Sequence, residues 1–305
     1  MINQAITTKL VKIYFYVCDK YDDELKYCCQ RFTNNNSPEF TDQEIMTIYL
    51  FCVNLEKRFK IKQMYEFVKN YFLDWFPKLP SYTAFVTRLN RLSEAFKGLA
   101  YRLIEENKPN GTEGVGVSLL DSMPIIICSG KRKGAVARDI ADKGFCSTKG
   151  IYYYGVKLHC LAFGMGSTKT LPYPESIVFS KASENDLTVF KENWADIPNR
   201  VFYGDKIYID KHFFEKFYDE KNSTMLTPIK LKKGEPENLR QFDKAYNDLY
   251  SKAVSAVRQP IEAFFNAIIE KTDIQRASKV RSTKGLLVHL FGKMAAVFLN
   301  PIFNS

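Results

Sequence analysis

The sequence predicts an α/β protein in which a mixed sheet flanked by helices follows an all-helical N-terminal region. Apolar residues recur at helical spacing through almost all of the first hundred residues. A polar break that contains Pro and Gly, residues 107–114, separates this region from short apolar runs and period-two alternation. Strand patterns first follow one another there and then alternate with helical patterns. We therefore expect a helical domain over residues 1–110 and an α/β domain over residues 111–305.

The N-terminal region carries two signals for the start of a helix. Thr41 and Glu44 form a capping box ahead of an apolar run over 45–52, since each side chain can satisfy a backbone amide that the helix leaves free. Ser81 is a predicted N-cap for a helix whose apolar positions continue to Phe96. Short helices with basic outer faces are compatible with a helix-turn-helix-like DNA-binding domain, and equally with a structural helical bundle.

The second region begins with strands. Residues 115–120 predict a buried strand that ends at Asp121, and residues 125–128 either continue this strand or form another. Residues 152–163 alternate between two faces with the period of a strand. The pattern then predicts a helix over 184–194, a strand over 200–204, a helix over 210–218 and a strand over 225–229. Helices are expected in the remainder.

The composition favours a globular protein with a polyanionic partner. Hydrophobic residues make up 46% of the 305 residues, which is enough to build sizeable cores. The formal charge is +10, and most of the excess lies in residues 111–305, which hold 28 basic and 21 acidic residues. The sequence shows neither an apolar run of about 18 residues nor an N-terminal signal pattern, so we expect a cytoplasmic protein without a membrane span. The seven cysteines lack zinc-ligand spacing, which disfavours structural zinc.

Three acids occupy positions that suit catalysis. Asp121 and Asp205 each follow a predicted strand, and Glu262 lies on a predicted helix with an apolar face. Carboxylates at strand ends lie at the rim of a sheet, where the active sites of open α/β folds are found. Gathered carboxylates need a cation, and oxygen ligands with few histidines favour Mg²⁺ or Mn²⁺ over zinc. For each acid taken singly, a solvated side chain or a helix cap is the alternative in a chain with 34 acidic residues.

Five segments in sequence order resemble the DDE-type insertion-sequence transposases. They are Asp121 and residues 153–159, 182–186, 204–210 and 258–262. The resemblance is nearest to the nine-eight-two group, among the transposases related to insertion sequence four. The chain departs from the broader family at two positions, Ser255 and Ile269, where a tyrosine and a lysine are frequent.

The resemblance implies a ribonuclease H-like catalytic core. Asp121, Asp205 and Glu262 would hold two Mg²⁺ or Mn²⁺ ions, and two such ions can activate a water or a 3′-hydroxyl for phosphodiester displacement. The implied partners are DNA, as terminal inverted repeats and target, and a second copy of the chain in a synaptic homodimer. We therefore expect a transposase that cleaves DNA and transfers strands at the ends of an insertion sequence. The alternatives are a ribonuclease H-like nuclease without strand transfer and an inactive, domesticated DNA-binding protein.

Basic and polar residues near the acids are candidates for DNA contact. A solvated loop is an equal alternative for residues 131–133 and 230–233, and a satisfied core histidine is the alternative for His159. For Asp186 and Asp210 we expect a structural role such as helix capping. The predicted DNA-binding residues are Lys131, Arg132, Lys133, Lys157, His159, Lys230, Lys232, Lys233 and Arg258.

Overall fold

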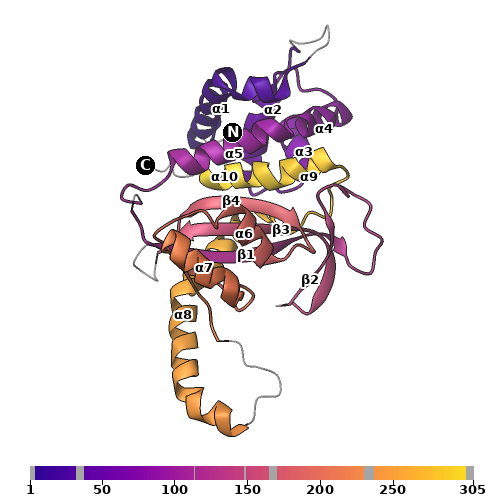
Figure 1. Ribbon diagram of the computed structural model, residues 1–305. Coiled ribbons are helices and arrows are strands. Elements are labelled where there is room, and N and C mark those ends of the chain that lie inside the picture. The colour runs from indigo at the N-terminus through magenta and orange to yellow at the C-terminus, as the bar shows by residue number, and fades with distance from the viewer. Residues whose placement is uncertain are drawn as a thin grey trace. The chain divides into compact units, whose positions relative to one another are not determined.

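The computed structural model describes residues 4–31, 38–112, 114–147, 149–164, 170–229 and 237–299, with the side chains of 237–243 left out (Figure 1). The chain divides into two compact units, described here one at a time. Unit 1 comprises Met1–Asn107, Gly134–Asp139 and Ile268–Ser305, and unit 2 comprises Lys108–Lys133 and Ile140–Ala267. No helix within the described ranges is both long enough and apolar enough to cross a membrane.

Unit 1 is helical, as the sequence predicts. Thr41 and Glu44 form the predicted capping box at the start of the second helix, and the Ser81 hydroxyl accepts a hydrogen bond from the amide of Ala84. The helices are α1 (Gln4–Asp23), η1 (Leu25–Cys29), α2 (Asp42–Asn54), α3 (Ile61–Tyr71), α4 (Tyr82–Arg91), α5 (Ser93–Glu106), α9 (Thr283–Leu287), η2 (Val288–Gly292) and α10 (Lys293–Phe298).

The C-terminal helices pack into unit 1, which differs from the predicted division at residue 110. The Asn54 amide donates a hydrogen bond of 2.6 Å to the carbonyl oxygen of Ala296, and the Asn107 amide donates one of 3.1 Å to that of Phe298. The apolar side chains of α10 are buried, among them Met294. A sequence pattern shows that these residues need an apolar partner but does not show which helices provide it.

A buried aspartate joins several segments of unit 1. The carboxylate of Asp42 lies 2.6 Å from Arg31, 3.0 Å from Arg88 and 3.2 Å from Arg91, and it accepts a hydrogen bond from Tyr21. These partners come from outside α2, so a single carboxylate ties α2 to α1, to α4 and to the segment that precedes α2.

The described residues of unit 2 form a mixed sheet of six strands, which confirms the predicted α/β class. The strand order is β2-β3-β1-β5-β6, and β4 also pairs with β3. Strands β1 and β3 are antiparallel, whereas β5 runs parallel to β1 and to β6. The sequence analysis did not identify β2 and β4. The strands are β1 (Val117–Ser129), β2 (Asp142–Cys146), β3 (Ile151–Phe163), β4 (Pro174–Lys181), β5 (Val201–Tyr203) and β6 (Thr224–Leu226).

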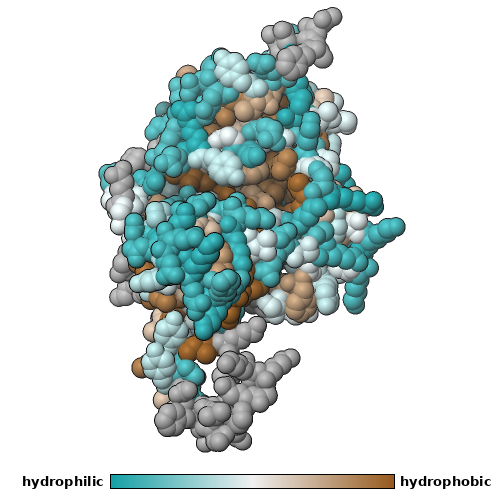
Figure 2. Space-filling model, in the orientation of Figure 1, coloured by the Kyte–Doolittle hydropathy of each residue, from teal (hydrophilic) through white to brown (hydrophobic). Residues whose placement is uncertain are grey.

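Two short helices, α6 (Asp186–Asn193) and α7 (Lys211–Lys221), cover one face of the sheet (Figure 1). Phe190 of α6 and Phe217 of α7 pack with Phe202 of β5 in one hydrophobic cluster. The outer side of this layer is hydrophilic in the face that Figure 2 shows. Both helices are therefore amphipathic, with aromatic side chains directed at the sheet.

The first strand is longer than predicted, because β1 continues without a break from Val117 through Pro124 to Ser129. Asp121 accordingly lies inside the strand and does not end it. The predicted end at Asp121 is wrong, and the alternative that residues 125–128 continue the strand is confirmed. A proline usually interrupts a strand, but here Pro124 stays paired with Lys157 of β3.

The long helix α8 (Glu237–Thr272) contains Pro260 in its interior. Its apolar residues Ile261, Phe264 and Phe265 are buried, in agreement with the predicted apolar face. The helix extends beyond the sheet in Figure 1. Because Arg258 and Glu262 are separated by four residues, they lie on the same side of α8.

We expect Asp42→Asn to lower the free energy of unfolding by about 3–5 kcal/mol, because three arginines would lose their buried counter-charge. Chemical denaturation measures this change. The matched control is Glu39→Gln, because Glu39 forms a 3.3 Å ion pair with Lys78 in which both side chains are exposed. That substitution should cost less than about 1 kcal/mol. Equal effects of the two substitutions would contradict the structural role of Asp42.

We expect the stability of the chain to rise with pH between about 7 and 10.5 through Lys293. Burial lowers the pKa of Lys293 from 10.5 to about 7, and its ammonium donates a 3.0 Å hydrogen bond to the carbonyl of Asp273. In this pH window the unfolded chain binds a proton that the folded chain has lost, so each rise in pH favours folding. Lys293→Met should remove about 3–5 kcal/mol of this pH dependence.

Denaturation curves at several pH values between 6 and 10.5 measure the effect. The control is Lys69→Met, at an exposed position of α3. An unchanged slope in Lys293→Met, or the same change in the control, would contradict this assignment.

Candidate active site

Two of the three predicted acids lie at the same level of the sheet. The parallel register of β1 and β5 pairs Val117 with Val201 and Leu119 with Tyr203. Strand β5 ends at Tyr203, so the same register continued by two residues sets Asp205 beside Asp121. The predicted position of Asp205 just after a strand is therefore correct, and Asp205 is exposed there.

Arg258 connects the third acid to the first. Its Nη1 lies 2.9 Å from Oδ2 of Asp121, and its Nη2 forms an ion pair with Oε1 of Glu262. The Arg258 side chain is only 13% exposed, against 21% for Asp121 and 52% for Glu262. One guanidinium thus holds a carboxylate of the central strand and a carboxylate of α8.

The charges of all four groups act on one another. Burial raises the pKa of Asp121 to about 6, while Arg258 and the amide of Ser122 oppose this change. The negative charges of Glu262 and Asp205 add to the increase. All three acids in turn raise the pKa of Arg258. Asp121, Asp205, Glu262 and Arg258 therefore form one electrostatic group, which we call the acidic cluster.

The chemistry of the acidic cluster suits a hard divalent cation. Its possible ligands are all carboxylate oxygens, and three carboxylates against one guanidinium leave a negative formal charge. In the described part of the chain, however, no group of three or more His, Cys, Asp or Glu side chains is arranged to hold an ion as it stands. The guanidinium of Arg258 takes up oxygens of Asp121 and Glu262, so an ion would have to compete with it for them.

A second polar network lies directly behind Asp121. The hydroxyl of Ser122 donates a 2.8 Å hydrogen bond to Asp186, and the ammonium of Lys157 lies 2.7 Å from the other oxygen of Asp186. Lys157 also donates to the carbonyl of Glu184. This network joins β1, β3 and the start of α6, so it fixes the strand that carries Asp121.

Two residues predicted to contact DNA are internal instead. His159 is fully buried on β3, where Nε2 lies 2.8 Å from the Ser180 hydroxyl and burial lowers the pKa of its imidazole to about 4. Lys157 is directed into the network around Asp186. Burial favours the alternative of a satisfied core histidine for His159 and a structural role for Lys157. Period-two alternation could not decide this, because it does not distinguish a solvated sheet face from one covered by helices.

Sequence reasoning gave Asp186 and Asp210 the same role, but they differ in the structure. Asp210 is the N-cap of α7 and accepts a hydrogen bond from the amide of Phe213, as predicted. The N-cap of α6 is Asn185, and Asp186 serves the network behind Asp121. Tyr208 was not identified, although it lies in a segment that carries the resemblance. Its hydroxyl is buried without a hydrogen-bond partner among the described residues. This burial raises its pKa, and the charges of Asp186, Asp121 and Asp205 add to the increase.

The other predicted DNA-binding residues fall into two groups. Lys131, Arg132 and Lys133 are exposed and follow the end of β1. Lys230, Lys232 and Lys233 lie outside the described residues. A DNA contact stays a prediction for all six residues and for Arg258.

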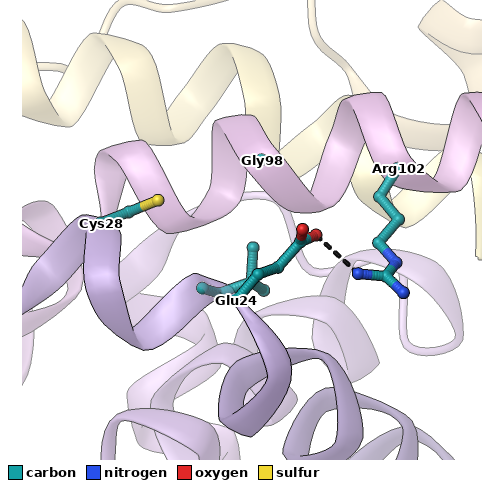
Figure 3. Close-up of a pocket in the computed structure, with 5 residues that line it drawn as sticks. Glu24, Cys28, Gly98 and Arg102 are labelled. Carbon is teal, nitrogen blue, oxygen red and sulfur yellow. Dashed lines mark ion pairs between the residues drawn. The ribbon is translucent and has the colours of Figure 1, made fainter.

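A pocket in unit 1 offers no comparable chemistry. It measures about 440 Å³ and is lined by Glu24, Leu25, Cys28, Gly98 and Arg102 (Figure 3). Glu24 and Arg102 form an ion pair of 2.8 Å, and Arg102 also binds Asp23. The charges of this pocket are thus neutralised within it, and the acidic cluster is the better candidate for an active site.

Comparison with known proteins identifies the family. A family profile described as Transposase DDE domain matches residues 111–282, a range that contains Asp121, Asp205 and Glu262. Searches of curated proteins and of solved structures give no match. Because the profile covers more than half of the 305 residues, the chain belongs to the family of proteins with a transposase DDE domain.

Proposed function

We propose that this protein is an active transposase that cleaves DNA at the ends of an insertion sequence and joins the exposed 3′-hydroxyl ends to target DNA. The observation that carries this proposal is the acidic cluster, in which Asp121, Asp205 and Glu262 share one electrostatic environment. The mixed sheet that presents Asp121 and Asp205 supports the implied ribonuclease H-like core. The five segments of resemblance support a place in the nine-eight-two group.

In this proposal Asp121, Asp205 and Glu262 are the ligands of the catalytic cations. Two bound Mg²⁺ or Mn²⁺ ions would activate a water or a 3′-hydroxyl and stabilise the leaving oxygen. Asp121 is the most rigid ligand, since the Ser122 amide donates a 2.8 Å hydrogen bond to it and the network around Asp186 fixes its strand. Glu262 is more exposed and can adjust its position from α8. The nucleophile belongs to water or DNA, so the enzyme needs no covalent intermediate.

Arg258 has a double role in the proposed reaction. It neutralises Asp121 and Glu262 while they have no other cation, since like charges at short range would otherwise separate them. Released from these oxygens, the guanidinium would be able to pair with a DNA phosphate, for which its planar donor geometry is well suited. Exchange of Arg258 between carboxylates and phosphate would link DNA binding to ion binding.

The proposed substrate is DNA in the cytoplasm, bound at the terminal inverted repeats. The formal charge of +10 favours association with a polyanion. Two DNA ends have to meet in one complex, so we propose a homodimer as the active assembly. The exposed residues Lys131, Arg132 and Lys133 are the proposed phosphate contacts of unit 2.

We expect Asp205→Asn to reduce cleavage by several orders of magnitude, because it removes a charge that holds a divalent ion while preserving size. DNA binding should persist or strengthen slightly, since one negative charge that faces the phosphates is removed. Cleavage is measured by incubating the protein with labelled terminal-repeat DNA and Mg²⁺ or Mn²⁺. A joining assay measures strand transfer, and a gel shift measures DNA binding.

The matched control is Asp210→Asn. Asp210 lies five residues beyond Asp205 and caps α7, outside the acidic cluster. Cleavage by this variant should stay close to that of the unmodified protein. Normal cleavage by folded Asp205→Asn would overturn the assignment, and cleavage without joining would reduce the proposed activity to that of a nuclease.

We also expect Asp121→Asn to stabilise the metal-free chain at neutral pH. The folded chain holds the Asp121 proton up to a pH of about 6, whereas the ordinary pKa is 3.8. Between these values the folded chain binds more protons, so stability falls as the pH rises. Asp121→Asn lacks this decline. Its free energy of unfolding, relative to that of the unmodified chain, should therefore rise by about 1–3 kcal/mol between pH 4 and pH 7.

Thermal denaturation in a chelating buffer at several pH values checks this result. Asp210→Asn should show the opposite sign, because hydrogen bonds from Lys191 and from the Phe213 amide lower the pKa of Asp210. The Asp210 carboxylate therefore stabilises the folded chain above its pKa, and this contribution is lost in acid. A difference of the same sign in both variants would contradict the electrostatic description of Asp121.

A further inference from the structure

The hairpin of β2 and β3 carries two exposed aromatic rings side by side. Phe145 and Tyr152 are direct partners in the antiparallel register, and their ring centroids are 4.9 Å apart. Phe145 is 51% exposed and Tyr152 is 69% exposed. Single exposed aromatic side chains need no explanation, whereas two that lie against each other form a contiguous apolar surface that can bind a partner.

The hairpin does not need these two rings for its own core. Its other face is buried through Cys146 and Tyr153, which pack with Ala182. Gly144 allows the hairpin to approach Ala182 closely, since a side chain there would meet the Ala182 carbonyl oxygen at 2.2 Å. The aromatic pair therefore lies on a supported surface and faces outward.

Basic residues lie on the segments next to the aromatic pair. Lys143 lies two residues before Phe145 on the same face of β2, and the amide of Gly130 donates a 2.9 Å hydrogen bond to the carbonyl of Tyr152. This bond brings the segment after Gly130 beside the aromatic pair. The nearest acid on β2, Asp142, accepts hydrogen bonds from Ser183. The exposed basic residues of this region are Lys131, Arg132, Lys133, Lys143 and Lys149.

We propose that Phe145 and Tyr152 form a stacking platform for unpaired DNA, with the surrounding lysines and arginine on its phosphates. Paired bases are stacked within a duplex and offer only their edges, whereas unpaired bases offer flat faces to aromatic rings. A surface that combines aromatic rings with positive charge is complementary to a single strand. This inference rests on the proposed function, because it assigns a place on the protein to a strand of the DNA substrate.

The platform and the acidic cluster are fixed to the same strand. Asp121 and Ser129 both belong to β1, and Ser129 pairs with Tyr153, the neighbour of Tyr152. Eight residues of strand span roughly 26 Å. The proposed platform therefore lies beside the end of β1, eight residues from Asp121.

The test measures binding of the full-length protein to a fluorescent 12-nucleotide oligothymidylate and to a blunt duplex of equal length, in chelating buffer. Phe145→Ala and Tyr152→Ala should each weaken binding of the single strand about 5- to 100-fold, as loss of one stacked base predicts. Binding of the duplex should change less than about twofold. Tyr152→Trp should retain affinity for the single strand.

The matched control is Tyr218→Ala, which removes a 58% exposed tyrosine from α7 of the same unit. This variant should bind the single strand normally. Equal losses for single strand and duplex, or an unchanged affinity of both platform variants, would overturn the proposal. It would also be overturned if the variants bound the oligonucleotide normally but sedimented as a smaller species, because the aromatic pair would then be a protein interface.

This experiment is independent of the catalytic one. The chelating buffer prevents cleavage, so affinity for the single strand does not depend on the acidic cluster. If Phe145→Ala and Tyr152→Ala bind the single strand normally while the unmodified protein cleaves DNA, the platform alone is rejected. If these variants bind the single strand more weakly but the unmodified protein does not cleave DNA, the proposed activity alone is rejected.

Discussion

The guanidinium of Arg258 joins two carboxylates that the chain supplies from distant positions, one on the central strand and one on α8. It lies 2.9 Å from Asp121 and forms an ion pair with Glu262 on its own helix. Asp121 is largely removed from solvent, so its charge needs a partner inside the protein. The position of α8 beside the sheet and the charge state of the candidate active site therefore depend on the same interaction.

The central strand β1 explains why this interaction can be precise. It pairs with β3 on one side and with β5 on the other, so its residues cannot shift without breaking both ladders. Ser122, the neighbour of Asp121, is bound to Asp186, which is bound in turn to Lys157. The aromatic side chains of α6 and α7 belong to one hydrophobic cluster with Leu120 of the same strand. A ligand fixed in this way suits chemistry that requires defined distances between reacting groups.

In the proposed mechanism, the group that changes is the cation that pairs with Asp121 and Glu262. A guanidinium and a divalent ion can each neutralise Asp121 and Glu262, but they differ in charge and in geometry. Arg258 holds Asp121 and Glu262 together through its ion pairs, and the proposed mechanism would require it to release them. Asp42 in unit 1 also pairs with buried positive charge, but there three arginines bind one carboxylate and the role is structural.

Local sequence signals determined much of this protein, because they act between residues a few positions apart. The capping box at Thr41, the N-cap at Ser81, the strand over 152–163 and the acid after β5 all follow from such signals. Position near a predicted strand made Asp121 and Asp205 candidates, the family resemblance joined Glu262 to them, and the change of period gave the α/β class. Tertiary structure decided the rest: that β1 continues through Pro124, that His159 is buried, that the C-terminal helices join unit 1, and that Phe145 meets Tyr152. It also decided that Arg258 pairs with Asp121, 137 residues away. These outcomes depend on which surfaces meet in space, and a periodic pattern specifies that a face is apolar or charged without specifying the face that it contacts.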